Sequence, residues 1–233
     1  GRRHRRITST PGCRVSQVTT DSISAPDAYA CLKTMDLSRL SAHTPTAVDD
    51  ASQRAAVLAP VFTRDGEAYV LFTKRAEHLG EHPGQMSFPG GSREPEDGSL
   101  EATALREADE EIGLRAAEVT VAGRLDDIRT VTGYSVRPFV GRIPDREYDP
   151  DDREVAEVVT LAVSELTAAE NYESERRDHP VYGAHRIHYF HVGSYTVWGA
   201  TGVMLTQLLE LTTEWRPPAE PDRVVDADAD FPV

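Results

Sequence analysis

Residues 84–114 read GQMSFPGGSREPEDGSLEATALREADEEIGL, and this stretch decides the fold that we predict. An apolar run ends in the turn Pro89-Gly90-Gly91, where missing side chains let the main chain approach a ligand closely. A polar, loop-like segment follows. From about Ser99, apolar residues recur at helical spacing: Leu100, Ala104, Leu105, Ala108 and Ile112. Gly113 then stands where a helix commonly ends in a left-handed residue.

The other face of this predicted helix is crowded with carboxylates. Glu107 lies three residues before Glu110 and four before Glu111, so these side chains can converge. Like charges at this spacing repel, and the negative end of the helix dipole disfavours them further. An acidic run alone is more often a solvated surface, but here the glycine turn, the single Arg106 and Gly113 accompany it. A hard divalent cation, which prefers oxygen ligands, would relieve the repulsion.

Residues 106–114, READEEIGL, resemble the second half of the Nudix hydrolase box, and Gly90-Gly91 resembles its opening. The family usually has a Glu eight residues before the Arg. That position is Gly98 here, and the nearest carboxylate is Asp97. The longer spacing is similar to the coenzyme A diphosphatase branch of the family. The preceding element also resembles that branch, through Leu79, His82, Gly84, Gln85 and Phe88-Pro89-Gly90-Gly91.

This resemblance implies Mg²⁺ or Mn²⁺ as cofactor and assigns roles to the acids. Glu107 and Glu111 would be the chief metal ligands, Glu110 would ligate or assist, and Arg106 would orient the carboxylates. A further ligand or base could come from Glu154 or Glu157, although solvation is the safer interpretation of so acidic a run. The substrate would contact residues of the glycine turn and the preceding element: Gly90, Gly91, His82 and Gln85.

The remaining chain predicts several strands and two further helices. Residues 54–62, RAAVLAPVF, read as a buried strand, and Asp65-Gly66 is a hairpin signal. The returning strand ends at Lys74 and Arg75, for which solvation and phosphate contact, including a substrate 3′-phosphate, are about equally open. Further strands are predicted at 119–125, 136–142, 155–163 and 185–192. Helices are predicted at 164–173, with Ser164 as N-cap, and at 195–211.

This order of elements predicts an α/β fold, an α/β/α sandwich around a mixed β-sheet as in Nudix proteins. We expect a disordered basic arm over residues 1–34, a single Nudix hydrolase domain over 35–216 and a disordered acidic tail over 217–233. By packing alone, Trp198 is a core residue.

Composition narrows the classes of partner. The net charge of −14 argues against a nucleic-acid binder, and no apolar run is long enough for a membrane span. The two cysteines, Cys13 and Cys31, lack metal-ligand spacing, so a reducing cytoplasm is the expected compartment. We expect a small nucleoside diphosphate substrate as partner, and a homodimer is left open.

The function that we predict is metal-dependent cleavage of a diphosphate, with coenzyme A or its derivatives as substrate and 3′,5′-ADP and 4′-phosphopantetheine as products. Two alternatives stay open. One is a Nudix hydrolase of another nucleoside diphosphate derivative, such as ADP-ribose, NADH or a dinucleotide. The other is a Nudix-like module that binds a nucleotide without hydrolysing it. The intact acids at Glu107, Glu110 and Glu111 argue against the second.

Overall fold

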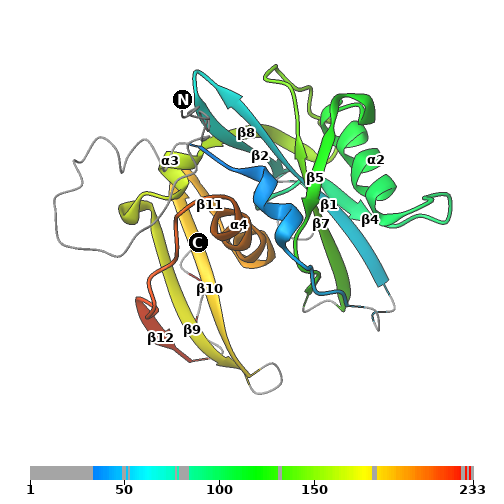
Figure 1. Ribbon diagram of the computed structural model, residues 1–233. Coiled ribbons are helices and arrows are strands. Elements are labelled where there is room, and N and C mark those ends of the chain that lie inside the picture. The colour runs from blue at the N-terminus through cyan, green and yellow to red at the C-terminus, as the bar shows by residue number, and fades with distance from the viewer. Residues whose placement is uncertain are drawn as a thin grey trace, which may run out of the picture.

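The computed structural model describes residues 34–48, 51, 53–76, 78, 84–130, 133–179, 183–226, 229 and 231 (Figure 1). His82 of the predicted site and almost all of the predicted N-terminal arm lie outside these residues. Within these ranges, no helix is long and apolar enough to cross a membrane. The domain limits that we expect stay a prediction.

The elements follow one another in a β-rich order. They are η1 (Leu37–Ala42), β1 (Gln53–Arg64), β2 (Glu67–Arg75), β3 (Met86–Ser87), β4 (Gly90–Ser92), α2 (Leu100–Ile112), η2 (Ala116–Glu118), β5 (Thr120–Arg124), β6 (Ile128–Arg129), β7 (Tyr134–Arg142), β8 (Val155–Ala162), α3 (Val163–Leu166), η3 (Ala169–Asn171), β9 (Tyr172–His179), β10 (Gly183–Val192), β11 (Tyr195–Val197), α4 (Gly199–Thr212) and β12 (Arg223–Val225).

Strand β1 is the centre of the larger sheet, whose order is β3-β2-β1-β7-β5. It pairs antiparallel with β2 through the turn at Asp65-Gly66, and parallel with β7 over nine residue pairs. Near its start, β1 also pairs with β4, which the sequence had indicated only as a turn and loop. β6 pairs with β7, and β8 pairs with β2. The mixed sheet confirms the predicted α/β class.

Helices α2 and α4 cover opposite faces of this sheet, because β1 is apolar on both sides. Ala56, Leu58 and Phe62 pack in one core cluster with residues of α2. Ala59 and Val61 pack in a second cluster with Leu205 and Leu208 of α4. The continuous apolar run of residues 54–62 is therefore explained by burial on two faces.

A second sheet, of order β11-β10-β9-β12, packs against α4 (Figure 1). The helix predicted over 164–173 is wrong in its extent: α3 ends at Leu166, its N-cap is Ala162, and Ser164 instead donates a hydrogen bond to Glu67. β9 escaped prediction because its sequence, YESERRDH, is polar. Its buried Glu175 and Arg177 form an ion pair of 2.6 Å that offsets part of the cost of burying both charges.

Two later segments also differ from prediction. Residues 195–197 form β11, and α4 begins at Gly199 instead of Tyr195. Within the predicted disordered tail, Arg223–Val225 form a strand parallel to β9. Arg223 binds Glu175 at 2.9 Å, so a charged side chain anchors a segment whose composition is typical of disorder. Trp198 stacks on Tyr189 with ring centroids 6.1 Å apart and contacts Phe231.

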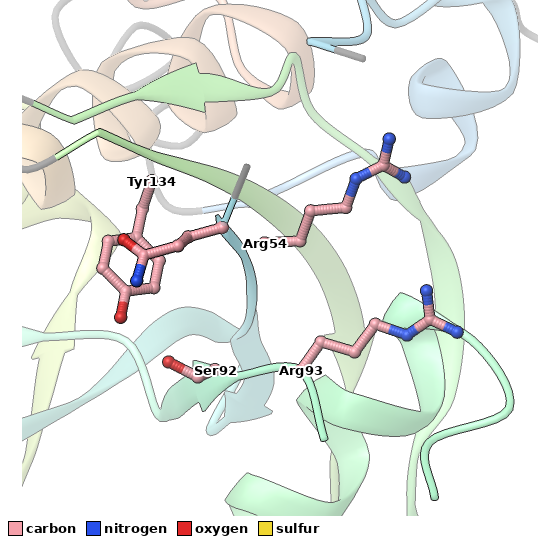
Figure 2. A pocket seen from close by; sticks show the side chains of 5 residues that line it. Arg54, Ser92, Arg93 and Tyr134 are labelled. Atoms are coloured by element: carbon pink, nitrogen blue, oxygen red, sulfur yellow. The ribbon is translucent and has the colours of Figure 1, made fainter. Parts of the chain in front are cut away.

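A cavity of about 380 Å³ opens at the rim of the larger sheet, where β1 and β7 begin and β4 ends (Figure 2). Its walls are formed by Gln53, Arg54, Ser92, Arg93 and Tyr134. Pairing brings these residues together, because Gln53 lies beside Tyr134 in the β1–β7 ladder, and Ser92 lies opposite Ala55 in the β1–β4 ladder.

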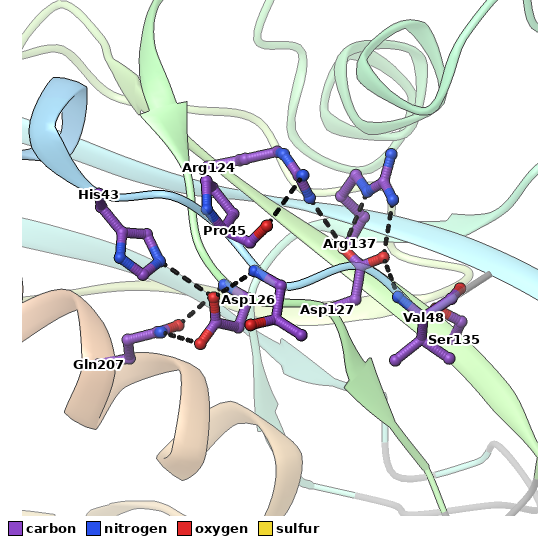
Figure 3. A network of polar contacts seen from close by, with 10 residues as sticks. His43, Pro45, Val48, Arg124, Asp126, Asp127, Ser135, Arg137 and Gln207 are labelled. Carbon is purple, nitrogen blue, oxygen red and sulfur yellow. Dashed lines mark hydrogen bonds and ion pairs between the residues drawn. The ribbon is translucent and has the colours of Figure 1, made fainter.

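A pair of aspartates fastens residues 43–48 to the core (Figure 3). Asp126 accepts hydrogen bonds from the Thr46 N–H at 2.8 Å and from Gln207 of α4 at 2.7 Å. Asp127, whose side chain is 1% exposed, accepts from Arg137 at 2.7 and 2.8 Å and from the Val48 N–H at 3.0 Å. Burial alone would raise the pKa of Asp127, but these hydrogen bonds outweigh it and hold the pKa below its ordinary value.

We predict that Asp127→Ala lowers the free energy of unfolding by about 3 kcal/mol or more, because it leaves a half-buried guanidinium without this partner. Urea denaturation measures the loss. The matched control is Asp145→Ala, which breaks the exposed pair with Arg64 and should cost much less. Equal losses in the two variants would contradict a structural role for the buried aspartate.

Candidate active site

Helix α2 has a defined start and end, which set the register of its acids. Ser99 caps the start by accepting a hydrogen bond from the Ala102 N–H at 3.1 Å. Gly113 ends the helix in the left-handed conformation, with φ of 63°. The Gly113 N–H donates to Asp109 O at 2.9 Å and the Leu114 N–H to Ala108 O at 3.2 Å, so the last turn is closed as the sequence predicts.

The glycines of β4 bring its main chain directly against the acids of α2. A β-carbon at Gly90 would collide with the main-chain carbonyl of Ala56, and one at Gly91 would lie 2.5 Å from Glu107 Oε1. The Gly90 N–H donates to Glu111 Oε2 at 3.3 Å. Glycine is needed here because the space for side chains is taken by strand β1 and by the acids.

Asp97 and Arg106 form the anchor of the acidic face. Asp97 accepts from Arg106 Nε and Nη2, both at 3.1 Å, and from the Glu94 N–H and the Thr103 hydroxyl. The hydrogen bonds from Arg106 hold the pKa of Asp97 well below its usual range. Asp97 thus supplies, one residue earlier, a carboxylate in place of the one absent at Gly98.

Arg106 in turn reaches three other groups. It lies 3.0 Å from Glu107 and 2.9 Å from Glu110, and it donates to the Ser92 carbonyl of β4 at 3.2 Å. Glu110 is therefore held by Arg106 on the exposed side of the helix, whereas Glu107 and Glu111 face β4. The structure brings together all four residues that the box predicts, with Arg106 as the link.

Negative charge accumulates between α2, β4 and the loop before β8. Burial raises the pKa of Glu111 to about 8, and the charges of Glu107 and Glu154 raise it further against the hydrogen bond from Gly90. Burial also raises the pKa of Glu107, with smaller contributions from Glu110 and Glu154. The loop is fixed there by hydrogen bonds from Asp151 N–H to Glu111 O and from Ala76 N–H to Glu154 O. Glu154 thus lies in the same electrostatic cluster.

These acids fit a hard divalent cation, because the donors are all oxygens and a cation would favour the ionised forms that burial and repulsion disfavour. Among the residues that the structure describes, no three His, Cys, Asp or Glu side chains already form a complete ligand set. Glu110 is turned toward Arg106 and Glu111 toward Gly90. Binding would therefore require rotation of these side chains.

Besides the two glycines, Arg75 is the predicted substrate residue whose charge acts on the acidic cluster. Arg75 is the last residue of β2, and its charge lowers the pKa of Glu111. It therefore lies near the start of β4, where Gly90 contacts Glu111. The Arg75 N–H donates to the Gln85 carbonyl at 3.0 Å. The side-chain amide of Gln85 lies beside Gly199 of α4, 3.5 Å from the point that a β-carbon there would occupy. Lys74 lies opposite Glu157 in the β2–β8 ladder. Glu157 accepts from the Tyr195 hydroxyl at 2.7 Å, which distinguishes it from Glu154.

A NUDIX domain family model matches residues 52–182, more than half of the chain. The chain belongs to the Nudix family. As a member of this family it is a hydrolase, and Nudix hydrolases generally use divalent metal ions. The family match stops before β10, so residues 183–226, which form β10, β11, α4 and β12, lie beyond it.

Relatives of this Nudix chain include proteins called uncharacterized Nudix hydrolase NudL. The one from Enterobacter sp. (strain 638) is 39% identical over 178 residues, which are 74% of this chain and 90% of that protein. The one from Yersinia pestis (strain Pestoides F) is 37% identical over 160 residues, 68% of this chain and 79% of that protein. The names of these relatives agree with the assignment to the Nudix family and give no substrate.

Solved structures with a similar fold are also Nudix proteins. A MutT/nudix family protein from Enterococcus faecalis is 15% identical, with a TM-score of 0.46 over 72% of this chain and 70% of that one. A Nudix hydrolase from M. smegmatis, RenU, is 25% identical, with a TM-score of 0.40 over 46% and 69% of the two chains.

We predict that Asp97→Asn lowers the free energy of unfolding by about 2 kcal/mol or more at pH 7, since charged hydrogen bonds to Arg106 are lost. The native pKa of Asp97 lies below its unfolded value of about 3.9. Its stabilisation is therefore complete above that value and is lost as the pH falls toward the native pKa. Urea denaturation at pH 7 and pH 3 should show the gap to wild type narrowing at the lower pH. A pH-independent gap would contradict this assignment.

Proposed function

We propose that this chain is a divalent-metal-dependent diphosphatase that cleaves coenzyme A or its derivatives. The observation that carries the catalytic part is the crowding of Glu107 and Glu111 against the glycine main chain of β4, with the charge of Glu154 acting on both carboxyls. Carboxyls whose pKa values are strongly perturbed cluster at functional sites. The substrate part rests on the spacing of Asp97 from Arg106 and on the element around Gln85, both of which resemble the coenzyme A branch.

Glu107 and Glu111 would hold the cation, with Glu110 as a further ligand after release from Arg106. When bound, Mg²⁺ or Mn²⁺ would neutralise phosphoryl charge and make an attacking water more acidic. Arg106 keeps the glutamates oriented through its bonds to Asp97 and Glu107. Glu154 is our candidate for an additional ligand or base, while the bond from Tyr195 makes Glu157 the weaker candidate.

The substrate diphosphate would lie over β4, with the main chain of Gly90 and Gly91 beside it. Arg75 and Lys74, at the end of β2, would supply positive charge to the phosphoryl oxygens. Water would then attack one phosphorus in line with the bond to the leaving phosphate, and positioning would supply most of the catalysis. With coenzyme A the products would be 3′,5′-ADP and 4′-phosphopantetheine. His82 and Gln85 would contact the substrate beyond the diphosphate.

The nearest alternative is hydrolysis of ADP-ribose, NADH or a dinucleotide at the same centre. A solved structure of the NUDIX domain of Shewanella oneidensis NrtR contains ADP ribose, but at 18% identity and a TM-score of 0.40 it does not bear on this substrate. A nucleotide-binding module without hydrolysis is less consistent with the chain, because pure binding has no need of the crowded acids. A cytoplasmic location and a homodimer stay predictions from the sequence.

We predict that Glu111→Gln loses most of the turnover while the protein remains folded, because one metal ligand is removed and charge repulsion falls. Steady-state hydrolysis at saturating Mg²⁺ measures the rate. Thermal unfolding with and without Mn²⁺ gives a second readout, since an ion bound only to the native state raises Tm, and the rise should be smaller in this variant. The matched control is Glu101→Gln, an exposed acid in the first turn of α2. Near wild-type rates for Glu111→Gln would remove this residue from the site.

Product analysis with coenzyme A, ADP-ribose, NADH and dinucleoside polyphosphates tests the substrate. We predict the highest kcat/KM for coenzyme A or its thioesters, because remote groups of the true substrate contribute to transition-state binding. Release of 3′,5′-ADP and 4′-phosphopantetheine would identify the cleaved bond. Faster hydrolysis of ADP-ribose or a dinucleotide would overturn the coenzyme A assignment and keep the hydrolase, whereas no metal-dependent hydrolysis of any of these substrates would contradict the proposal as a whole.

A further inference from the structure

Two arginines face each other across the β1–β4 pair at the rim of the larger sheet. The Arg93 N–H donates to the Arg54 carbonyl at 2.9 Å, so these residues are cross-strand neighbours. Both line the cavity of about 380 Å³ with Gln53, Ser92 and Tyr134 (Figure 2). Like charges directly opposite in a sheet are destabilising. The arrangement places two guanidinium groups at one hollow of a chain whose net charge is −14.

The position of Arg93 is fixed by a neutral acceptor. Its Nη2 donates to the main-chain carbonyl of Asp97 at 3.1 Å, a bond that orients the guanidinium without cancelling its charge. The carboxylate of the same Asp97 binds Arg106 of the acidic cluster. Asp97 thus orients both Arg93 at the cavity and Arg106 beside the proposed metal ligands.

Strand β4 connects this cavity to the reaction centre. Along it, Gly90 contacts Glu111, Gly91 lies against Glu107, and the Ser92 carbonyl accepts from Arg106. From Gly90 to Arg93 the chain advances about 10 Å at the usual rise per strand residue. Arg75, by contrast, lies at the Glu111 end, where its charge acts on that carboxyl. Basic groups therefore occur at both ends of this short path.

We propose that Arg54 and Arg93 bind a second anionic group of the substrate, a phosphomonoester on the ribose, while the diphosphate lies at Glu107 and Glu111. This proposal rests on the proposed function and changes one expectation, because it moves the 3′-phosphate contact from Lys74 and Arg75 to the cavity. Guanidinium groups form paired, charge-assisted bonds with phosphate oxygens, and the Arg54 and Arg93 side chains extend side by side in the same direction (Figure 2).

The chemistry of the substrate agrees with this geometry. In coenzyme A, the atoms O5′, C5′, C4′, C3′ and O3′ separate the diphosphate from the 3′-phosphate. A compact sugar thus holds the two phosphates apart, and they can lie along β4 with Arg75 of β2 near one end and Arg93 just after the other. Dephospho-coenzyme A has the same diphosphate and lacks only the second anion, so it isolates the contribution of this contact.

The kinetic test compares kcat/KM for coenzyme A and dephospho-coenzyme A in wild type, Arg54→Gln and Arg93→Gln. We expect wild type to prefer coenzyme A by about ten- to a hundred-fold, as loss of a charge-assisted contact implies. Each variant should lose most of this preference by slowing coenzyme A alone. Arg75→Gln should slow both substrates, and the matched control Arg176→Gln, on β9, should slow neither. An unchanged preference in the two cavity variants would overturn the proposal.

A binding test separates this proposal from the proposed function. Calorimetry with EDTA present measures binding of 3′,5′-ADP and 5′-AMP, which differ by the 3′-phosphate alone. Wild type should bind 3′,5′-ADP more tightly, and Arg93→Gln should bind the two alike, with partial recovery in Arg93→Lys. If coenzyme A is not hydrolysed but this pattern holds, the proposed function fails and the phosphate site stands. If coenzyme A is hydrolysed and the variants bind both nucleotides as wild type does, the phosphate site fails alone. Should a Gln variant unfold early in thermal melts, Arg54→Lys and Arg93→Lys replace it, and the expected result is then a partial loss of the preference for 3′,5′-ADP, because the charge remains and the paired guanidinium contact is lost.

Discussion

The contact between the main chain of β4 and the carboxylates of α2 is the constraint on which the rest of this structure depends. Two glycines let the strand approach the helix closely. Glu107 occupies the space that a side chain at position 91 would need, and Glu111 accepts a hydrogen bond from the Gly90 N–H. The contact fixes α2 against the sheet, and it also forces negative charges into a partly buried space. Fold and reactivity therefore have one origin, because the packing that orders the helix produces the electrostatic conflict.

The conflict is limited by the Asp97–Arg106 pair. Arg106 reaches Glu107, Glu110 and the carbonyl of Ser92 while Asp97 holds it from the loop. Arg106 reaches Glu107 and Glu110, whereas the positive charge that lowers the pKa of Glu111 is that of Arg75. The residual charge lies on the side that faces β4, where a diphosphate with its metal ions could approach. The Asp97–Arg106 pair thus determines which carboxylates of the cluster are available to bind a cation.

Local sequence was sufficient to predict the box helix, its glycine end, the β1–β2 hairpin and the burial of β1. These features depend on spacing between neighbours. Strand β9 of the second sheet was missed because Glu175 and Arg177 are buried as a pair, and apolar periodicity does not reveal the burial of polar residues. The cavity at Arg54 and Arg93 required the β1–β4 pairing, and that pairing joins residues far apart in sequence. The proximity of Glu154 to Glu111 likewise depends on tertiary hydrogen bonds.

The position of β1 also orders events during synthesis of the chain. Its hairpin with β2 can form as soon as residue 75 has emerged, because the contacts are local. Its parallel partner β7 lies about 80 residues later, and loop closure over that length is slow. Until β7 is made, one edge of the most apolar strand stays without its partner, and such an edge is prone to intermolecular pairing. The nascent chain is therefore most vulnerable to aggregation during the interval in which α2 is being completed.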